Sequence, residues 1–229
     1  MIYIESIYSN ITHIKNYYSN PTIINVSPFV HNGYLSAFSP YYPHGNIRVP
    51  ITPQYTAVSV QAAWQGLKVF ENSDVDINTF KIKDFTKVDR TIKQFGKLRG
   101  FRKGVNGNII LDLAEARKKL YIPTYRQVLD YHLNTIIAQI RQFETNHNYV
   151  LLDDYVIFDI DNCNIPLSHA ALIKAYIKGT YPYEDVFEMK EHFHTYIGRK
   201  YYQWKTYERK PKDISPFSIS NQLTFDFDN

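Results

Sequence analysis

The chain has 229 residues, of which 44% are hydrophobic and 21% charged. This length and composition are sufficient to form a hydrophobic core and exclude an intrinsically disordered chain. The formal net charge of +4 is too small to indicate a nucleic-acid-binding protein by itself. The apolar runs fall short of the roughly 18 residues that span a bilayer, and the single cysteine, Cys163, excludes an internal disulfide and a thiolate zinc site.

The first part of the chain predicts a strand, a helix and a second strand. Residues 1–7 and 22–26 are rich in Ile, Tyr and Val, and a helix is expected over 11–18. The start has neither a basic segment nor a small-residue cleavage site, so we expect a cytoplasmic protein. Residues 27–56 are crowded with Pro, Gly, Asn and Ser, which predicts irregular backbone. A loop of this length commonly forms part of a site.

A helix is predicted over residues 59–71, because the hydroxyl of Ser59 can cap the free amides of its first turn. Helical spacing of i, i+4 and i+7 gives this helix one apolar face and one neighbouring polar stripe. The apolar face consists of Val60, Trp64 and Leu67. The polar stripe consists of Gln61, Gln65 and Lys68, whose groups can all donate hydrogen bonds.

The later part of the chain is predicted to be mostly helical. Helices are expected over 88–95, 109–121, 124–143 and 184–210, with a strand at 149–152. A further helix runs from a cap at Ser168 to Lys178 and is ended by Gly179. These elements predict an α+β fold, with a helix-rich single domain and a small β-sheet over residues 1–182. Residues 183–229 are expected to form a helical extension and a polar tail.

Two side chains are candidates for chemistry on their residue type and position alone. Asp153 follows an apolar strand, where a carboxylate either caps a turn or acts on a ligand. Lys68 lies on a mostly apolar helix, where loss of its proton would make it a nucleophile. The default alternative is a lysine whose stem covers apolar surface. His192 and His194 face different sides of their helix, so we expect no metal site there.

A basic stretch covers residues 81–103 and holds nine bases and two acids. Three phenylalanines lie among these cations, a mixture that binds phosphates and stacks on bases, although packing of the rings in the core explains them equally well. The glycine-rich residues 103–108 are expected to precede a helix and to offer backbone amides to a phosphate.

Several short segments resemble the NADAR superfamily of N-glycosidic-bond-cleaving proteins. The segment 59–68, SVQAAWQGLK, is similar to the central helix of that family. The segments LSAFSP at 35–40 and KQFGK at 93–97 resemble the family's preceding loop and its later basic motif. A closer resemblance, over residues 1–182, is to a little-characterised phage and bacterial family that shares the segments SPYYPHG, WQGLKVFE, RKGVNG and PLSHA.

The resemblance implies a hydrolase that acts on a nucleotide, an ADP-ribose derivative or an ADP-ribosylated nucleic acid, in the cytosol of a bacterium or of a phage-infected cell, without a cofactor or metal. It implies that Lys68 forms a transient Schiff base with the opened ribose, while Gln61 and Asp153 orient the sugar or water. The residues expected to contact the ligand are Ser36, Phe38, His44, Arg48, Trp64, Gln65, Lys97, Arg102 and Lys103.

Two alternatives to this enzyme stay open. Gln61 stands where the family usually has a glutamate, and an amide cannot act as a general base. This departure favours a non-catalytic protein that binds a nucleotide, for instance a phage counter-defence factor. The basic stretch favours instead a nucleic-acid-binding protein, whose affinity would depend strongly on salt.

Overall fold

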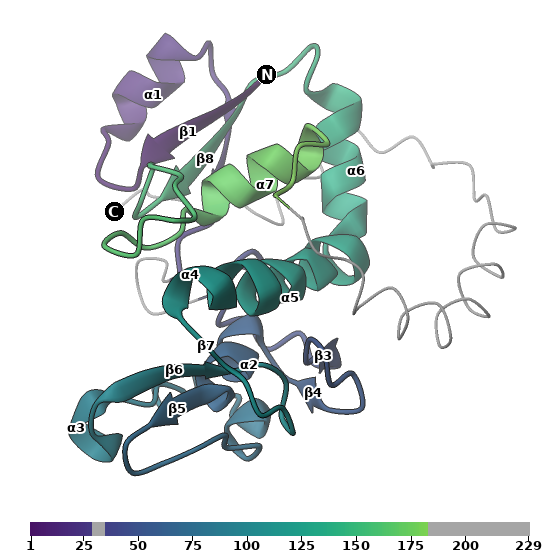
Figure 1. Ribbon diagram of the computed structural model, residues 1–229. Helices are drawn as coiled ribbons and strands as arrows, with labels where there is room; N and C mark the ends of the chain where they lie inside the picture. The colour runs from purple at the N-terminus through teal and green to yellow at the C-terminus, as the bar shows by residue number, and fades with distance from the viewer. Residues whose placement is uncertain (29–34, 183–229) are drawn as a thin grey trace, which may run out of the picture.

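The computed structural model describes residues 1–28 and 35–182 and confirms an α+β fold in this part of the chain (Figure 1). Helices pack around three small sheets within these residues. The helix expected over 184–210 and both histidines of that segment lie outside the described residues. No helix in the described part is both long and apolar enough to cross a membrane.

The first sheet is parallel and consists of β1 (Ile2–Ser6), β8 (Tyr149–Asp153) and β2 (Thr22–Asn25), in that order. The sequence predicts all three strands, but not that β8 enters between the first two. Helix α1 (Ile11–Tyr17) connects β1 to β2 and is capped by Asn10.

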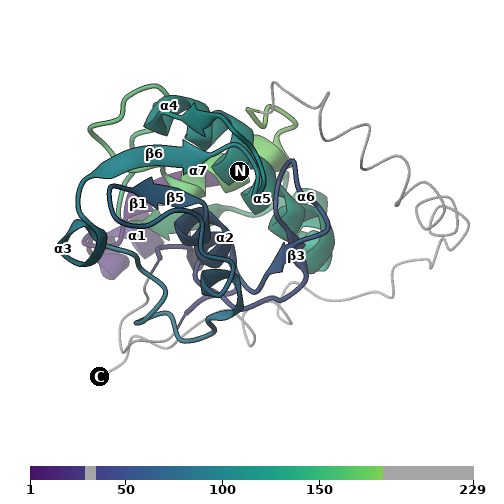
Figure 2. The same ribbon diagram turned by 60° about the horizontal axis from the view of Figure 1, so that its bottom comes forward.

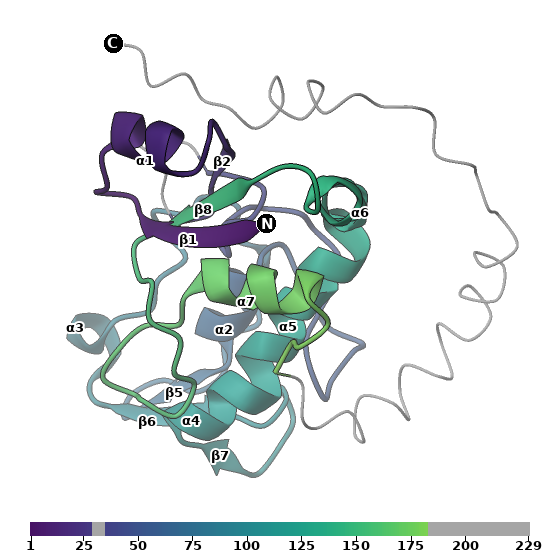
Figure 3. The ribbon, with the colours of Figure 1, turned by 90° about the horizontal axis from the view of Figure 1, so that it is seen from above.

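Helices cover both faces of this sheet, and the two-residue period of β8 explains how. Val150 and Leu152 point to α1 and pack on Ile14. Tyr149 and Leu151 point to the opposite face, where α7 (His169–Ile177) lies (Figure 3). Asp153 continues this second series, so its side chain is directed towards α7.

A long, interrupted helical stretch links the two halves of the molecule. It consists of α4 (Leu113–Ala116), a π-helical turn (Arg117–Tyr121), α5 (Ile122–Gln127), a second π-helical turn (Val128–His132) and α6 (Asn134–Phe143). Pro123 lies in the first turn of α5, where its missing N–H is tolerated best. The prediction of a helix starting at residue 109 was wrong, since residues 110–111 form a strand.

The second half contains two small antiparallel sheets. One pairs β3 (Ile47–Arg48) with β4 (Thr56–Ala57) inside the predicted irregular region. The other consists of β5 (Lys68–Phe70), β6 (Leu98–Arg102) and β7 (Ile110–Leu111). Helix α2 (Val60–Gly66), the 3-10 turn Thr79–Lys81 and α3 (Ile92–Phe95) complete this half, which Figure 2 shows with α3 at its outer end.

Two predicted helices are shorter than expected. Helix α2 begins after Ser59 as predicted, because the hydroxyl of Ser59 accepts from Ala62 N–H at 3.0 Å. It ends at Gly66 rather than at residue 71, because the backbone of Lys68 pairs with Phe101 in the antiparallel sheet. The predicted helix over 88–95 is restricted to α3, because Arg90 is buried against backbone carbonyls.

Candidate active site

A carboxylate held by two amides and a phenol forms the centre of the candidate site. Gln61 and Gln65 lie one helical turn apart on α2, and their Nε2 atoms donate to Oδ1 of Asp89 at 2.9 and 2.7 Å. The phenol of Tyr41 lies 3.4 Å from both carboxylate oxygens of Asp89 and also accepts from Gln61 at 3.1 Å. Both glutamines are buried, whereas Asp89 is exposed. We call these four residues the Asp89 cluster.

The Asp89 cluster leaves one carboxylate oxygen available. Oδ1 of Asp89 accepts both amide bonds, while Oδ2 has, among the described residues, only the long contact with Tyr41. The pKa of the Tyr41 phenol is raised, first by burial and then by the charge and hydrogen bond of Asp89, so Tyr41 stays protonated and donates to the carboxylate. The cluster therefore fixes a carboxylate of which one oxygen accepts both amide bonds and the other is approached only by the Tyr41 hydroxyl in the described residues.

The amine of Lys68 lies within electrostatic reach of this carboxylate. Lys68 is the first residue of β5, not part of the helix as predicted, and its side chain is half-buried. Burial lowers the pKa of the amine, the Asp89 carboxylate opposes this shift, and the Arg90 guanidinium adds to it. Among the residues that the structure describes, none forms a hydrogen bond or ion pair with the Lys68 amine. A lysine with these properties is partly neutral at lower pH than a surface lysine, as a nucleophile requires.

Trp64 packs against two other aromatic rings. Trp64 lies on α2 between the two glutamines and is only partly buried. Its ring lies 3.9 Å from that of Phe101, the residue directly opposite Lys68 in the sheet. Tyr121 packs edge-on against Trp64, at 5.2 Å between ring centroids. Trp64 is thus a partly exposed aromatic side chain on the helix that also carries Gln61 and Gln65.

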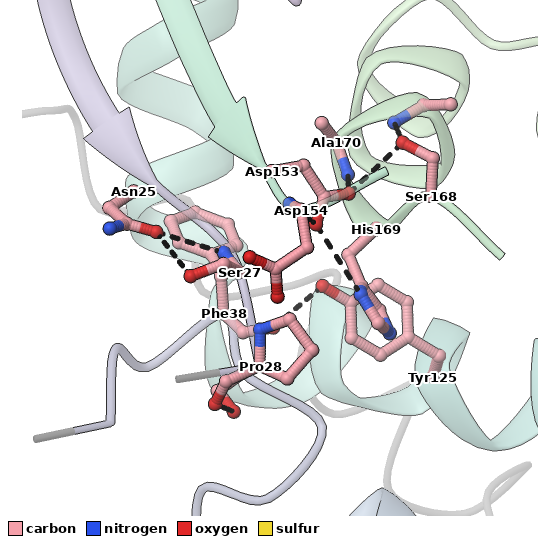
Figure 4. A network of polar contacts seen from close by, with 12 residues as sticks. Asn25, Ser27, Pro28, Phe38, Tyr125, Asp153, Asp154, Ser168, His169 and Ala170 are labelled. Atoms are coloured by element: carbon pink, nitrogen blue, oxygen red, sulfur yellow. Dashed lines mark hydrogen bonds and ion pairs between the residues drawn. The ribbon is translucent and has the colours of Figure 1, made fainter. Parts of the chain in front are cut away.

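Asp153 has a different environment from the one its predicted role requires. Its carboxylate is fully buried and accepts from the Ser168 hydroxyl at 3.0 Å and from Ala170 N–H at 2.9 Å, at the start of α7 (Figure 4). Burial raises the pKa of Asp153, and these hydrogen bonds partly oppose the shift. The described contacts therefore make Asp153 an anchor of α7, the capping role that the sequence leaves open.

The imidazole of His169 continues this buried network. Its Nδ1 lies 4.0 Å from Asp153 Oδ1 and has no hydrogen-bond partner in the described structure, while its Nε2 is 2.7 Å from the Tyr121 hydroxyl. Burial lowers the pKa of His169 to about 4, so the ring is neutral at pH 7. We call Asp153 and His169 the α7 anchor. His169 contacts Tyr121, and Tyr121 packs on Trp64 of helix α2, so the α7 anchor is connected to α2.

The predicted contacts in the 36–48 loop are mainly structural. Phe38 is fully buried, and its carbonyl accepts from the Tyr125 hydroxyl at 2.8 Å. The imidazole of His44 bonds the Ala37 carbonyl at 2.8 Å, and burial lowers the pKa of His44 to about 4. The backbone of Arg48 exchanges two bonds with Gln127. The hydroxyl of Ser36 is buried and has no partner in the part of the chain that the structure describes.

The basic residues of 81–103 do not form one free cationic surface. Arg90 is buried, Lys87 pairs with Asp84 at 3.1 Å, and Arg102 forms an ion pair with Asp74. Lys103 is half-buried, whereas the side chain of Lys97 is exposed. Five cations of this stretch are exposed and lack an ion-pair partner in the described residues: Lys81, Lys83, Lys93, Lys97 and Arg99.

The prediction that residues 103–108 precede a helix was wrong, because strand β7 follows them. Their amides are also used internally: Lys103 N–H donates to Ile109 at 2.9 Å and Val105 N–H to Thr52 at 3.1 Å. The next helix, α4, is capped by the Asp112 carboxylate, which already supplies the negative charge that a helix start attracts. This segment therefore shows no prepared phosphate site.

The sequence alone does not indicate Asp89, Tyr41 or Arg90 as site residues. In the sequence, Asp89 is merely one of two acids in a basic stretch. The signal that could have indicated it is the pair Gln61 and Gln65, since each of two amides on a helix face that becomes buried needs a hydrogen-bond partner. Within the described residues, no group of three or more His, Cys, Asp or Glu side chains is placed to hold a metal ion.

Comparisons with known proteins give a family but no activity. No curated protein and no solved structure matches the chain. One family matches residues 6–173, which cover most of the chain and include every residue of the Asp89 cluster and Lys68. The chain belongs to this family, which is described as a family of unknown function (DUF6939).

Proposed function

We propose that the protein is an N-glycosidase-like hydrolase that acts on a nucleotide or an ADP-ribose derivative, with Lys68 as the nucleophile and Asp89 as the catalytic carboxylate. The observation that supports this most is the Asp89 cluster, in which Gln61 and Gln65 hold a carboxylate beside an amine of lowered pKa. Gln61 cannot act as a base, but its amide positions the group that can.

The proposed reaction begins with attack of the neutral Lys68 amine on the anomeric carbon of the ribose. The new C–N bond forms as the bond to the leaving group breaks, and the leaving group departs with the electron pair. Nicotinamide leaves as a neutral base, whereas guanosine takes up a proton as it leaves. The ring then opens to a Schiff base, and the ring oxygen receives the proton of the amine. Water adds to the imine carbon and releases the free sugar and the amine.

Asp89 would serve this reaction in two ways. Its negative charge stabilises the oxocarbenium-like centre that develops as the base leaves. Its outer oxygen, Oδ2, is available to relay the proton of the amine to the ring oxygen and later to accept a proton from water. Trp64 supplies an aromatic surface on which a base or sugar can stack.

The proposal is tested by incubating the purified chain with NAD and with ADP-ribosylated guanosine and separating the products by chromatography. The variants are Lys68→Ala and the isosteric Asp89→Asn, in which the amide oxygen still accepts from both glutamines. Their controls are Lys93→Ala and Asp84→Asn, which remove the same groups from exposed positions.

We expect the wild-type chain and both controls to release the base, and each site variant to lose about 100-fold or more of kcat. Full turnover by Lys68→Ala would exclude the nucleophile assignment. Retention of the ligand without any product, in the wild-type chain, would contradict the hydrolase and support the nucleotide-binding alternative.

A further inference from the structure

Arg90 follows Asp89 in the chain and is 6% exposed, although it carries a full charge. Its Nη1 donates to the carbonyls of Lys68 at 2.8 Å and Gln65 at 3.1 Å, with a longer contact of 3.5 Å to Gly66. One guanidinium therefore binds both the end of α2 and the start of β5. These are the segments that carry the glutamines of the cluster and the reactive lysine.

The other contacts of Arg90 fix its own position. Nη2 donates to the Ser73 hydroxyl at 2.6 Å and to the Asp74 carbonyl at 2.7 Å. The rings of Phe70 and Phe95 lie 5.3 and 5.1 Å from the guanidinium carbon. A planar, five-donor group suits this arrangement, whereas the single ammonium of a lysine cannot reach all of these acceptors.

Gln65 connects Arg90 to the carboxylate. Its Oε1 accepts from the backbone N–H of Arg90 at 3.1 Å, while its Nε2 donates to Asp89 at 2.7 Å. Both polar atoms of one buried amide thus bind two consecutive residues. This fixes the backbone at Asp89 and the direction of the Asp89 side chain together.

From these contacts we infer that Arg90 is the positioning residue of the site, which holds the Lys68 amine and the Asp89 carboxylate in one fixed geometry without itself touching the substrate. The inference rests on the proposed function only for its role in turnover. The geometry and its effect on Lys68 are properties of the free protein.

Arg90 also acts on Lys68 through its charge. Burial is the main cause of the lowered pKa of Lys68, and the nearby guanidinium lowers it further, while Asp89 raises it. Asp76 and Asp74 are the acidic groups that act on Arg90 itself, and an arginine in a protein stays charged. Removing the guanidinium charge should therefore raise the pKa of the Lys68 amine.

The test is competitive acetylation of the lysines from pH 6 to 11, with modification at Lys68 measured by peptide mass spectrometry. Arg90→Gln removes the charge and most of the hydrogen-bond donors. Arg90→Lys keeps the charge but lacks the planar set of five donors. Lys87→Gln is the matched control. Lys87 lies three residues before Arg90, and its substitution removes one positive charge from a surface ion pair with Asp84.

In Arg90→Gln we expect the titration midpoint of Lys68 to rise and its acetylation at pH 7.5 to slow by at least about threefold, which corresponds to half a pKa unit. In Arg90→Lys we expect a titration midpoint of Lys68 near that of the wild type. Acetylation of Lys68 at high pH should be faster, because the start of β5 loses its hydrogen bond to the guanidinium. The kcat should be at least about tenfold lower, with a similar KM. Lys87→Gln should match the wild type in each measurement.

An unchanged Lys68 midpoint in folded Arg90→Gln, or an equal shift in Lys87→Gln, would overturn the inference. If Arg90→Gln does not fold, Arg90→Lys decides, and an acetylation profile identical to that of the wild type would contradict the positioning role. Acetylation needs no substrate, so the two proposals can fail separately. If the acetylation of Lys68 changes as expected but the wild-type chain releases no base, the proposed function is refuted and Arg90 is still the positioning residue.

Discussion

At the scale of single residues, two carboxylates of the molecule differ in what surrounds them. Asp89 is exposed and keeps one oxygen free of strong donors within the described residues, whereas Asp153 is fully buried and bonded at both oxygens. A group that takes up and releases protons during a reaction needs access to the substrate. The contrast supports the proposal that Asp89 rather than Asp153 takes part in the chemistry, while the contacts of Asp153 anchor α7.

The buried carboxylate of Asp153 predicts a measurable pH dependence of stability. Burial raises its pKa in the folded state, so the stability that this group contributes is present at low pH and is lost as pH rises through the folded pKa. In the Asp153→Asn variant, the amide at this position does not titrate. The free energy of unfolding of Asp153→Asn should therefore increase relative to the wild type as pH rises from about 4 to 7.

This prediction is checked by urea unfolding of both proteins at several pH values in that range. Groups distant from Asp153 titrate alike in the two chains, so the difference between them reports on Asp153 and its neighbour His169. A difference that is constant, or that falls with pH, would contradict a raised pKa.

At pH 7, Asp153→Ala should lower the free energy of unfolding by about 3 kcal/mol, because it leaves the Ser168 hydroxyl and Ala170 N–H without an acceptor.

The candidate site was only partly predictable at this scale. Local spacing indicates the stripe of Gln61, Gln65 and Lys68. In the structure both glutamines bond to Asp89, and the charge of Asp89 acts on the Lys68 amine without a direct contact. Asp89 itself lies 28 residues from Gln61 in the chain. Helical periodicity contains no information about such a contact, because it depends on how the intervening segment folds back.

At the scale of elements, the junction between α2 and β5 decides where the lysine lies. Gly66 ends the helix, and a side chain there would collide with its surroundings. An added Cβ would lie 2.2 Å from Phe80 Cε1 and 2.9 Å from the Asp76 carbonyl. The close approach of Phe80 thus requires glycine at the point where the chain turns towards Lys68.

Gly66→Ala is accordingly expected to destabilise the protein by about 3 kcal/mol through overpacking, despite the better helix propensity of alanine. Gly179→Ala is the control: this glycine ends α7 at φ +74°, with nothing within 4 Å of the added Cβ. It should cost only about 1 kcal/mol, from backbone strain. Thermal unfolding of both variants compares the two costs, and equal losses would contradict the packing argument.

The starts of two helices could be predicted from the sequence, whereas the end of α2 could not. The caps at Ser59 and Ser168 are local signals, and both helices begin where these serines predict. The end of α2 depends instead on pairing with β6, which lies about thirty residues later in the chain. A helical pattern in the sequence continues through Lys68, but the cross-strand partner overrides it.

At the scale of the whole molecule, the site lies where two hydrophobic cores meet. One core packs the parallel sheet against α5, α6 and α7, and the other packs α2 against the antiparallel sheet. Trp64 contacts both cores, and Tyr121 joins it to the α7 anchor. The sequence predicts the α+β class of this architecture from its elements, but the meeting of the cores depends on packing between distant segments.

We propose Lys68 as the reactive amine of this molecule. The most direct measurement incubates the protein with ADP-ribose, whose opened sugar carries an aldehyde, and reduces any Schiff base with cyanoborohydride to a stable amine. Peptide mass spectrometry then locates the adduct. We predict that it forms faster at Lys68 than at the exposed Lys83 or Lys93, because the lowered pKa of Lys68 leaves a larger neutral fraction of its amine at pH 7.5. An adduct at Lys83 or Lys93 that forms as fast as the one at Lys68 would contradict the account.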